Sequence, residues 1–262
     1  MNTDKHWQYY GKNCPYWSVV TWDEFKGDIA SDGELLDRFF FTGQEYVRNI
    51  LSVVKSVNPE FKPSTLLDFG CGVGRLLVPF AETGLSVSGV DISEDMLRIA
   101  EGNLSSRGLK CGQLVRALDD LPAEGKYDLV HSYIVLQHIP VNRGYAIIRQ
   151  LLDRVSRQGI AVLHVTYASE RISAKWLWPS IRNLLLNVIV RVGLLGRIYR
   201  TLKGKIANPP MLIGKYSLNK LFAMLNQERF NNLHVCHTIH GDNMGIIIIA
   251  QRHGASQYDE RF

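Results

Sequence analysis

The sequence predicts an α/β fold built around a doubly wound, mostly parallel sheet. The middle of the chain alternates short apolar segments typical of strands with amphipathic segments typical of helices. A glycine-rich turn within Leu66–Arg75 joins the first of these strands to a helix. Two strand-like runs near the C-terminus, Leu233–His240 and Ile246–Ala250, turn on the sequence GDNMG, and we expect this hairpin to close the sheet.

Length and composition are those of a globular protein. The 262 residues are 46% hydrophobic and 21% charged, which excludes a collagen, a disordered tail protein and a coiled-coil rod. This length fits one large domain, or a core with a sizeable appendage. The net charge of +5 is too small to require a nucleic-acid partner, and we predict none.

The cysteines and the N-terminus favour a cytoplasmic location. Four cysteines lie far apart without a CxxC pair, so we expect reduced thiols and neither a disulfide framework nor a zinc knuckle. The first residues lack the apolar run of a secretory signal. The most apolar stretch, Leu184–Gly196, is shorter than the ~20 residues that a membrane-spanning helix needs.

The central core of the chain, residues 65–167, carries the alternating elements. We expect strands at Thr65–Phe69, Ser86–Asp91, Leu114–Leu118, Tyr127–Tyr133 and Ile160–Tyr167, and helices at Val73–Glu82, Ser93–Leu104 and Val141–Ser156. Ser93 is the expected N-cap of its helix, because a serine hydroxyl can accept a backbone N–H of the first turn. Glu94 and Asp95 follow it and suit the positive end of the helix dipole.

Three further regions flank this core. Residues 1–64 form an aromatic and then helical cap, in which Thr42–Glu45 fits a capping box before a helix at Tyr46–Val57. Residues 168–214 form a basic, apolar and helical insertion. Residues 215–262 supply a helix at Ser217–Phe230 and the closing hairpin.

The glycine turn and a later aspartate indicate a bound cofactor. Gly70, Gly72 and Gly74 follow the first strand directly, and glycine lets a ligand approach the main chain closely and permits positive φ. Seventeen residues after Gly74, the second strand ends in Asp91, which is placed to receive the two hydroxyls of a ribose. This combination predicts a cofactor of the adenosine type.

Glycine spacing and charge narrow the choice of cofactor. The turn reads G-x-G-x-G, whereas a dinucleotide fingerprint reads G-x-G-x-x-G. Asp68, two residues before the first glycine, would repel a pyrophosphate. It suits an ammonium or sulfonium group, because opposite charges at ~4 Å attract by about 4 kcal/mol at an effective dielectric of 20.

With these motifs, the sequence resembles the class I S-adenosylmethionine-dependent methyltransferase family over Leu66–Tyr167 and the closing hairpin. The resemblance implies a Rossmann-like sheet of seven strands with the last strand antiparallel, and S-adenosylmethionine as the cofactor. It also implies that Asp68 and Gly70 hold the methionine portion, that Asp91 contacts the ribose and that Ile92 lies beside the adenine. The remaining expected cofactor-binding residues are Cys71, Gly72, Gly74, Leu118 and Ser132.

One position departs from the family pattern. After the third strand the family usually carries Asp-Ala, whereas this chain has Ala117-Leu118 and so lacks the usual carboxylate for the adenine amine. Leu118 can still pack on the adenine ring, and Asp119 or Asp120 can replace the carboxylate.

His138 is the predicted catalytic base. Methyl transfer to a hydroxyl is an in-line displacement that needs an aligned acceptor and a group to take its proton. In the family, a histidine in an L-x-H-I/V motif lines the active site, and His138 matches this position after the fourth strand. The alternative is a structural histidine bonded to a backbone carbonyl. Tyr133 and Gln137 can shape the same wall.

Two other motifs are interpreted as structural. Asn208–Met211 resembles the N-P-P-aromatic motif of nitrogen methyltransferases, but methionine replaces the aromatic ring and the segment comes after the fifth strand, so we interpret it as a loop. His234, Cys236, His237 and His240 could suggest a metal site. We expect an ordinary edge strand instead and no metal.

The flanks carry the clues to the acceptor. Arg171–Lys220 contains ten basic and no acidic residues, which leaves −5 on the rest of the chain. Its apolar residues recur at helical spacing. We favour a lid helix packed on the core; the alternative is peripheral membrane contact through residues 171–205, which would make the protein membrane-associated.

The N-terminal aromatic residues between Trp7 and Trp22 can stack on a sugar or apolar acceptor, or pack against the sheet. A diffuse similarity to methyltransferases of polysaccharide biosynthesis favours O-methylation of a hydroxyl on a sugar or lipid-linked glycan. The alternatives are a small natural product or amine as acceptor, and a non-catalytic cofactor-binding regulatory subunit.

Overall fold

The computed structural model describes residues 3–169 and 208–252. Most of the predicted insertion at 168–214, including the basic helix, lies outside the described residues.

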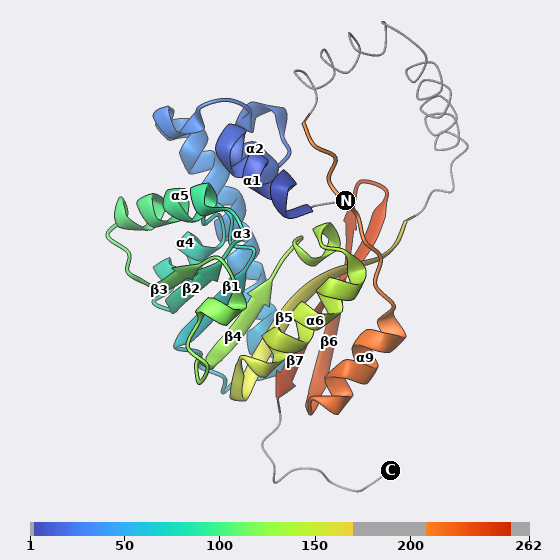
Figure 1. Ribbon diagram of the computed structural model, residues 1–262. Helices are drawn as coiled ribbons and strands as arrows, with labels where there is room; N and C mark the ends of the chain where they lie inside the picture. The colour runs from blue at the N-terminus through green and yellow to red at the C-terminus, as the bar shows by residue number, and fades with distance from the viewer. Residues whose placement is uncertain (1–2, 170–207, 253–262) are drawn as a thin grey trace, which may run out of the picture.

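The described strands form one sheet of seven in the order β3-β2-β1-β4-β5-β7-β6 (Figure 1). They are β1 (Thr65–Phe69), β2 (Ser86–Val90), β3 (Cys111–Val115), β4 (Tyr127–Ser132), β5 (Val155–Ser169), β6 (Phe230–His240) and β7 (Asn243–Arg252). The pairs among β1 to β5 are parallel, whereas β7 runs antiparallel to both β5 and β6. This arrangement confirms the predicted doubly wound sheet with its antiparallel last strand.

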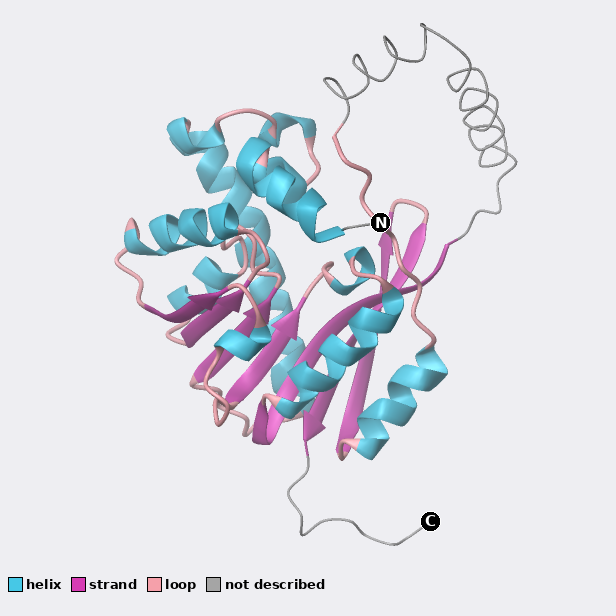
Figure 2. Ribbon diagram, in the orientation of Figure 1, coloured by secondary structure: helices cyan, strands magenta, loops and turns pink. Residues whose placement is uncertain are grey.

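The helices cover both faces of the sheet and one of its edges (Figure 2). They are α1 (Thr3–Asn13), α2 (Pro15–Val19), α3 (Gly33–Val57), α4 (Leu77–Glu82), α5 (Glu94–Ser105), α6 (Val141–Asp153) and α9 (Leu218–Gln227). Short 3-10 turns are η1 (Asp23–Phe25), η2 (Ile29–Ser31), η3 (Leu118–Asp120) and η4 (Leu136–His138). Helices α3 to α5 pack on one face and α6 and α9 on the other, while α1 and α2 lie over the edge where the parallel strands end.

The hydrophobic core is divided by the sheet into two layers. Side chains alternate along a strand, so Leu66 of β1 enters the layer shared with Phe39 and Phe80, and Leu67 enters the layer shared with Ile148. All five of these side chains are almost completely buried. Burial on both faces explains why the central strands read as continuous apolar runs in the sequence.

Two boundaries near the glycine turn differ from the prediction. Helix α4 begins at Leu77 rather than Val73, because Gly70, Gly72 and Gly74 take φ of +77°, +54° and +85°, which an α-helix does not allow. Strand β3 ends at Val115, so Leu118 lies in η3 instead of the predicted strand. The result is a longer main-chain loop at the edge of the sheet than the sequence indicated.

The start predicted for the N-terminal helix is wrong. Helix α3 begins at Gly33, and its N-cap is Asp32, whose side chain accepts a hydrogen bond from the Leu35 N–H at 3.1 Å. The predicted capping residue Thr42 lies inside the helix, where its Oγ1 donates to the Phe39 carbonyl at 2.7 Å. Phe39 and Phe40 are buried, and this apolar face holds the extra turns against the sheet.

The other elements follow the prediction closely. The Ser93 hydroxyl accepts the Met96 N–H at 3.4 Å, as expected for the N-cap of α5, and the Ser217 hydroxyl caps α9 in the same way. Helix α6 ends at Asp153, three residues early, because β5 already begins at Val155. The hairpin strands β6 and β7 are longer than predicted and leave Gly241 and Asp242 as the turn.

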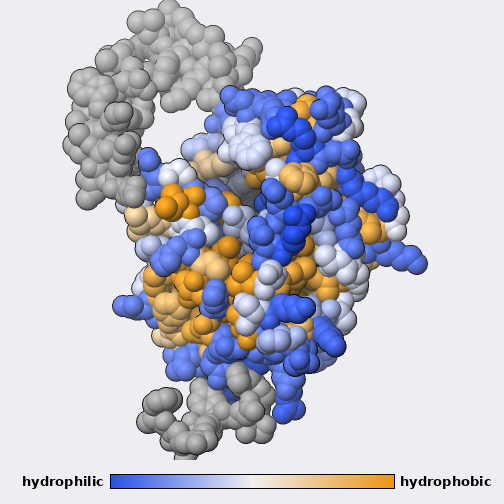
Figure 3. Space-filling view, turned by 180° about the vertical axis from the view of Figure 1, so that it is seen from behind, coloured by the Kyte–Doolittle hydropathy of each residue, from blue (hydrophilic) through white to orange (hydrophobic). Residues whose placement is uncertain are grey.

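Seen from behind, a broad hydrophobic area crosses the middle of the molecule between hydrophilic residues (Figure 3). None of the helices within residues 3–169 and 208–252 is long and apolar enough to cross a membrane.

Candidate active site

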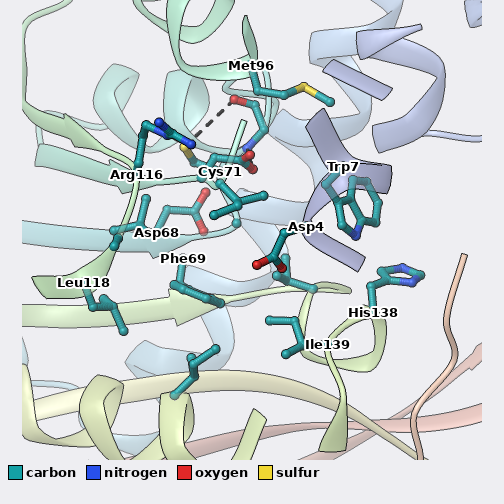
Figure 4. Close-up of a pocket in the computed structure, with 18 of the residues that line it drawn as sticks. Asp4, Trp7, Asp68, Phe69, Cys71, Met96, Arg116, Leu118, His138 and Ile139 are labelled. Carbon is teal, nitrogen blue, oxygen red and sulfur yellow. Dashed lines mark hydrogen bonds between the residues drawn. The ribbon is translucent and has the colours of Figure 1, made fainter. Parts of the chain in front are cut away.

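A cavity of about 380 Å³ opens at the carboxyl ends of β1, β2 and β4, beneath α1 and α2 (Figure 4). The chain order reverses between β1 and β4, and ligands of open α/β sheets bind at such a switch point. Eight of the ten predicted site residues line this cleft: Asp68, Gly70, Cys71, Gly72, Asp91, Ile92, Leu118 and His138.

Gly74 and Ser132 do not line the cleft. A Cβ on Gly74 would make an ordinary 3.4 Å contact with the Ala100 Cβ of α5, so it is the φ of +85° that favours glycine here. The Ser132 hydroxyl donates to the Phe69 carbonyl at 3.0 Å and thereby ties β4 to β1. The structure therefore places both residues behind the wall of the cleft, in contrast to the ligand contacts predicted for them.

The floor of the cleft, lined by residues 68–72, Arg75, Asp91 and Ile92, is anchored to β2 by main-chain hydrogen bonds. The N–H groups of Gly70 and Cys71 donate to the Val90 carbonyl at 2.7 and 3.1 Å. A Cβ on Gly70 would overlap the side chain of Val135, and one on Gly72 would lie 3.0 Å from Val19. Only glycine fits here, and the main chain is left open to a ligand.

Asp91 is held in place by two backbone donors. Its Oδ2 accepts the Gly72 N–H at 3.0 Å, and its Oδ1 accepts the Ser93 N–H at 2.9 Å. Burial raises the pKa of Asp91 to about 6, although both hydrogen bonds act in the opposite direction. A carboxylate can accept about four hydrogen bonds, so two acceptor sites remain for a pair of hydroxyls from the cleft.

Asp68 belongs to a buried hydrogen-bonded chain. The Nδ1 of His131 lies 2.8 Å from Asp68 Oδ1, and the Nε2 of His131 lies 2.9 Å from the hydroxyl of Tyr46. The tautomer that satisfies both contacts accepts the Tyr46 proton at Nε2 and donates from Nδ1 to Asp68. This chain orients the Asp68 carboxylate toward the cleft.

His131 was not among the site residues predicted from the sequence. The register of the sheet could have indicated its place beside Asp68, because Asp68 of β1 and His131 of β4 are direct partners in the parallel ladder.

His138 lies at the cleft and is also bonded to a backbone carbonyl. Its Nδ1 donates to the Leu212 carbonyl at 2.7 Å. Its Nε2 lies 3.3 Å from the amide nitrogen of Gln137, whose Oε1 accepts a hydrogen bond from Thr166 at 2.5 Å. Burial lowers the pKa of His138, so the ring is neutral at neutral pH and keeps its lone pair on Nε2.

The roof of the cleft is formed by α1 and the end of α2, and residues 208–214 contact α1 without lining the cleft themselves. The Trp7 ring of α1 lies 5.2 Å from the His138 ring, and Figure 4 shows both on one side of the cleft, with Asp68 and Leu118 on the other. Asp4 forms a 2.6 Å ion pair with Arg143 of α6. The Tyr10 hydroxyl donates to the Pro209 carbonyl.

Residues 208–216 form no helix or strand, which confirms that Asn208–Met211 is a loop. Its contacts with Tyr10 and His6 hold α1 over the cleft. The predicted aromatic cap is therefore attached to a segment about 200 residues away.

The structure separates the two aspartates that could replace the missing adenine carboxylate. Asp119 lines the cleft beside Leu118 and accepts a hydrogen bond from Gln150 at 3.3 Å. Asp120 turns away, and its Oδ2 accepts the Ala117 N–H at 3.0 Å. Arg116 also lines this end of the cleft and was missed by sequence analysis.

Among the histidines of β6, His240 packs against other side chains, whereas His234 and His237 are exposed. His240 contacts His164 edge to face, with ring centroids 5.3 Å apart, and His164 bonds the Thr238 hydroxyl at 2.9 Å. Residues 3–169 and 208–252 contain no group of three or more side chains positioned to ligate a metal ion.

Comparison with known proteins agrees with this geometry. Residues 66–159 match the family model described as a methyltransferase domain. The ubiquinone biosynthesis O-methyltransferase of Caulobacter vibrioides is 36% identical over 81 residues, which cover 30% of this chain and 32% of that enzyme. The ajmaline N-methyltransferase of Rauvolfia serpentina is 28% identical over 120 residues, covering 44% of this chain and 40% of the relative. The chain thus spans about a third to two fifths of these curated relatives.

Solved structures resemble the whole fold. The magnesium protoporphyrin IX methyltransferase of Synechocystis PCC 6803, solved with bound SAH, aligns with a TM-score of 0.59 at 21% identity, covering 93% of this chain and 96% of that one. An S-adenosylmethionine-dependent methyltransferase from Clostridium acetobutylicum aligns with a TM-score of 0.54 at 12% identity, covering 79% and 91%. At these identities the likeness concerns the fold.

Proposed function

We propose that this chain, whose residues 66–159 form a methyltransferase domain within a class I methyltransferase fold, transfers the methyl group of S-adenosylmethionine to a hydroxyl of a small acceptor. The observation that carries the proposal is one cleft that contains an open glycine loop, two carboxylates and a neutral histidine. The relatives that it matches are O- and N-methyltransferases.

The residues of the cleft fit this cofactor. Gly70 and Gly72 present only main chain to the cleft, so a ligand can lie against it. Asp91 has acceptor sites for the ribose hydroxyls, Leu118 and Ile92 offer apolar surface to the adenine, and Asp119 can accept from its amine. Asp68 supplies negative charge near the cationic end of the molecule. When bound, S-adenosylmethionine supplies a methyl group on a positively charged sulfur.

The protein contributes alignment and a proton acceptor. The glycine loop and Asp91 hold the cofactor, while the roof covers the cleft and keeps water from the reacting groups. His138 takes the hydroxyl proton at Nε2, where the acceptor replaces the long 3.3 Å hydrogen bond from Gln137, because Nδ1 is already committed as a donor to Leu212. The acceptor oxygen is thereby left as the nucleophile.

The lining of the cleft favours an acceptor with an apolar portion. Trp7, Val135 and Ile139 face the cleft near His138. A site with this much apolar surface suits an apolar ring or chain better than a sugar alone. We therefore propose a small, largely apolar hydroxyl compound. The predicted sugar or lipid-linked glycan hydroxyl remains the second candidate, supported by the stacking surface of Trp7.

The test compares cofactors and then acceptors. Titration calorimetry should show binding of S-adenosylmethionine and S-adenosylhomocysteine, and weak or no binding of NAD. Tight binding of NAD alone would contradict the proposal. An acceptor panel of phenols, sugars and amines, read by S-adenosylhomocysteine formation, then identifies the class. Cofactor binding without turnover on this panel or on cell extract would favour a regulatory subunit instead.

Membrane contact through residues 171–205 is a separate proposal, supported by the basic residues and helical periodicity of the sequence. Flotation of the full chain with anionic and with neutral vesicles tests it. Binding to anionic vesicles at low salt is expected, and its absence favours the lid interpretation.

A further inference from the structure

Arg75 lines the cleft and forms no ion pair in the described part of the chain, although the Asp68 carboxylate is near enough to raise its pKa. It follows the last glycine of the loop directly, and its side chain is partly buried. Its Nε is shielded from water and has no hydrogen-bond acceptor. Its one side-chain hydrogen bond within the described residues runs from Nη1 to the Thr42 hydroxyl at 3.4 Å.

Other arginines of the described chain show how such a group is usually satisfied. Arg143 pairs with Asp4 at 2.6 Å, and Arg38 pairs with Glu24 at 3.1 Å. Arg252 donates from both Nη atoms to carbonyls, at 3.2 and 2.8 Å, although its Nε, like that of Arg75, has no acceptor. A guanidinium that is withdrawn from water and lacks such partners is unfavourable, and burial lowers the pKa of Arg75 accordingly.

The position of Arg75 is fixed by its surroundings. Helix α3 approaches it so closely that a Cβ on Gly43 would overlap the Arg75 carbonyl oxygen. The Tyr46 and Tyr133 rings lie near it, tilted by 32° to each other with centroids 4.1 Å apart, and their nearness is among the causes that act on the Arg75 pKa. The guanidinium is thus held at the cleft between α3 and the end of β4, with donors unused.

We propose that Arg75 binds a carboxylate of a ligand in this cleft. A planar guanidinium offers parallel N–H groups that match the two oxygens of a carboxylate, and apart from the 3.4 Å contact with the Thr42 hydroxyl the two Nη groups of Arg75 have no partner within the described residues. The inference rests on the proposed function. The carboxylate has two sources in that reaction, the amino-acid end of S-adenosylmethionine and an acid group on the acceptor.

The first arm of the test addresses the cofactor. Calorimetry compares S-adenosylmethionine with its decarboxylated analogue on the full-length wild type, Arg75→Met and Arg75→Lys. If Arg75 binds the cofactor carboxylate, the wild type prefers S-adenosylmethionine by about 10- to 100-fold, the range for hydrogen bonds between charged groups, and Arg75→Met loses the preference. Arg98→Met, at an exposed arginine of α5, is the matched control and keeps it.

The second arm addresses the acceptor. Protein saturated with S-adenosylhomocysteine is titrated with 4-hydroxybenzoate and with its uncharged methyl ester. If Arg75 binds an acceptor carboxylate, the acid binds more tightly than the ester to the wild type, Arg75→Met abolishes the difference, and its affinity for the cofactor is unchanged.

Thermal unfolding separates binding from a structural role. Without ligand, Arg75→Met is expected to unfold at the same or a higher temperature than the wild type, because it removes a guanidinium that lacks a partner. If Arg75→Met prefers the carboxylate form of each ligand pair as strongly as the wild type does, in both arms, the proposal is overturned, whatever the stability of the variant. Failure of the wild type to bind either cofactor form would instead refute the proposed function, before any variant is compared.

Discussion

The floor of the cleft is built from segments that lie close together in the sequence, whereas the roof depends on contacts between segments that lie far apart in it. The floor takes its residues from 68–72, 75 and 91–92, at the ends of two strands that are neighbours in the sheet. In the roof, α1 is attached to residues 208–214, through contacts such as Tyr10 with Pro209 that span about 200 positions. The floor is therefore determined by a local motif, whereas the roof depends on tertiary packing. This difference separates cofactor binding from acceptor access.

The largest expected effect concerns His138, the proposed proton acceptor, which lies beside Trp7 of the roof. Replacing His138 with alanine removes the proton acceptor, and turnover should fall about 10²- to 10⁴-fold, the usual contribution of a general base. S-adenosylhomocysteine affinity should stay within about threefold, because His138 is not part of the floor. Initial rates and calorimetry give both numbers.

The control for this variant is His237→Ala, at an exposed position of β6. The wild-type rate should also fall at low pH as His138 becomes protonated. Because burial lowers the pKa of His138, this fall should occur below pH 6.5, the ordinary pKa of a histidine. Wild-type turnover by His138→Ala would show that the histidine has only its structural bond to Leu212.

The second prediction tests the floor through Gly70. Gly70→Ala combines positive φ with a clash against Val135, so it should weaken cofactor binding by about tenfold or more and also lower stability by about 1–3 kcal/mol. Gly84→Ala is the matched control. Its φ is +92° but nothing lies within 4 Å of its Cβ, so it should lose stability through backbone strain and keep cofactor affinity. Equal affinity losses in the two variants would show that the loop does not contact the cofactor.

The sequence was sufficient for the floor because its signals are short-range. Strand, glycine turn and the carboxylate of Asp91 lie within 30 residues, and their geometry follows from strand register and glycine φ. The length of α3 could not be read from Thr42, since the apolar face around Phe39 decides where that helix begins. The roof was predicted only as an aromatic cap. Its contacts with 208–214 depend on packing that no local pattern encodes.

The third prediction uses the pH dependence of the floor. Burial raises the pKa of Asp91 from 3.8 to about 6, so in the folded protein the carboxylate ionises only as the pH rises through that value. Taken alone, this shift makes folding less favourable as the pH rises from about 4 to 6, because the folded state holds the proton more tightly. Ribose hydroxyls donate to the ionised form. Cofactor affinity should therefore be full above about pH 6 and fall by up to about tenfold per pH unit below it.

Calorimetry in buffers of different ionisation enthalpy checks this pH dependence, because cofactor binding below about pH 6 should release a proton from Asp91. Asp91→Asn removes the titration and should bind weakly at every pH. An unchanged slope in that variant would assign the pH dependence to another group.

The smallest expected effect concerns the roof alone. Asp4 of α1 and Arg143 of α6 form an ion pair whose side chains are 39% and 48% exposed, and exposed pairs contribute about 0.2–1 kcal/mol. Asp4→Asn should therefore raise the acceptor KM by less than about fivefold with little change in kcat, and the effect should shrink as salt screens the pair. Asp95→Asn, which breaks a similarly exposed pair with Arg98 on α5 away from the roof, is the control. A double-mutant cycle with Arg143→Met isolates the coupling between the two residues. Coupling near zero, together with an unchanged KM, would show that α1 is held over the cleft by Tyr10 and His6 instead.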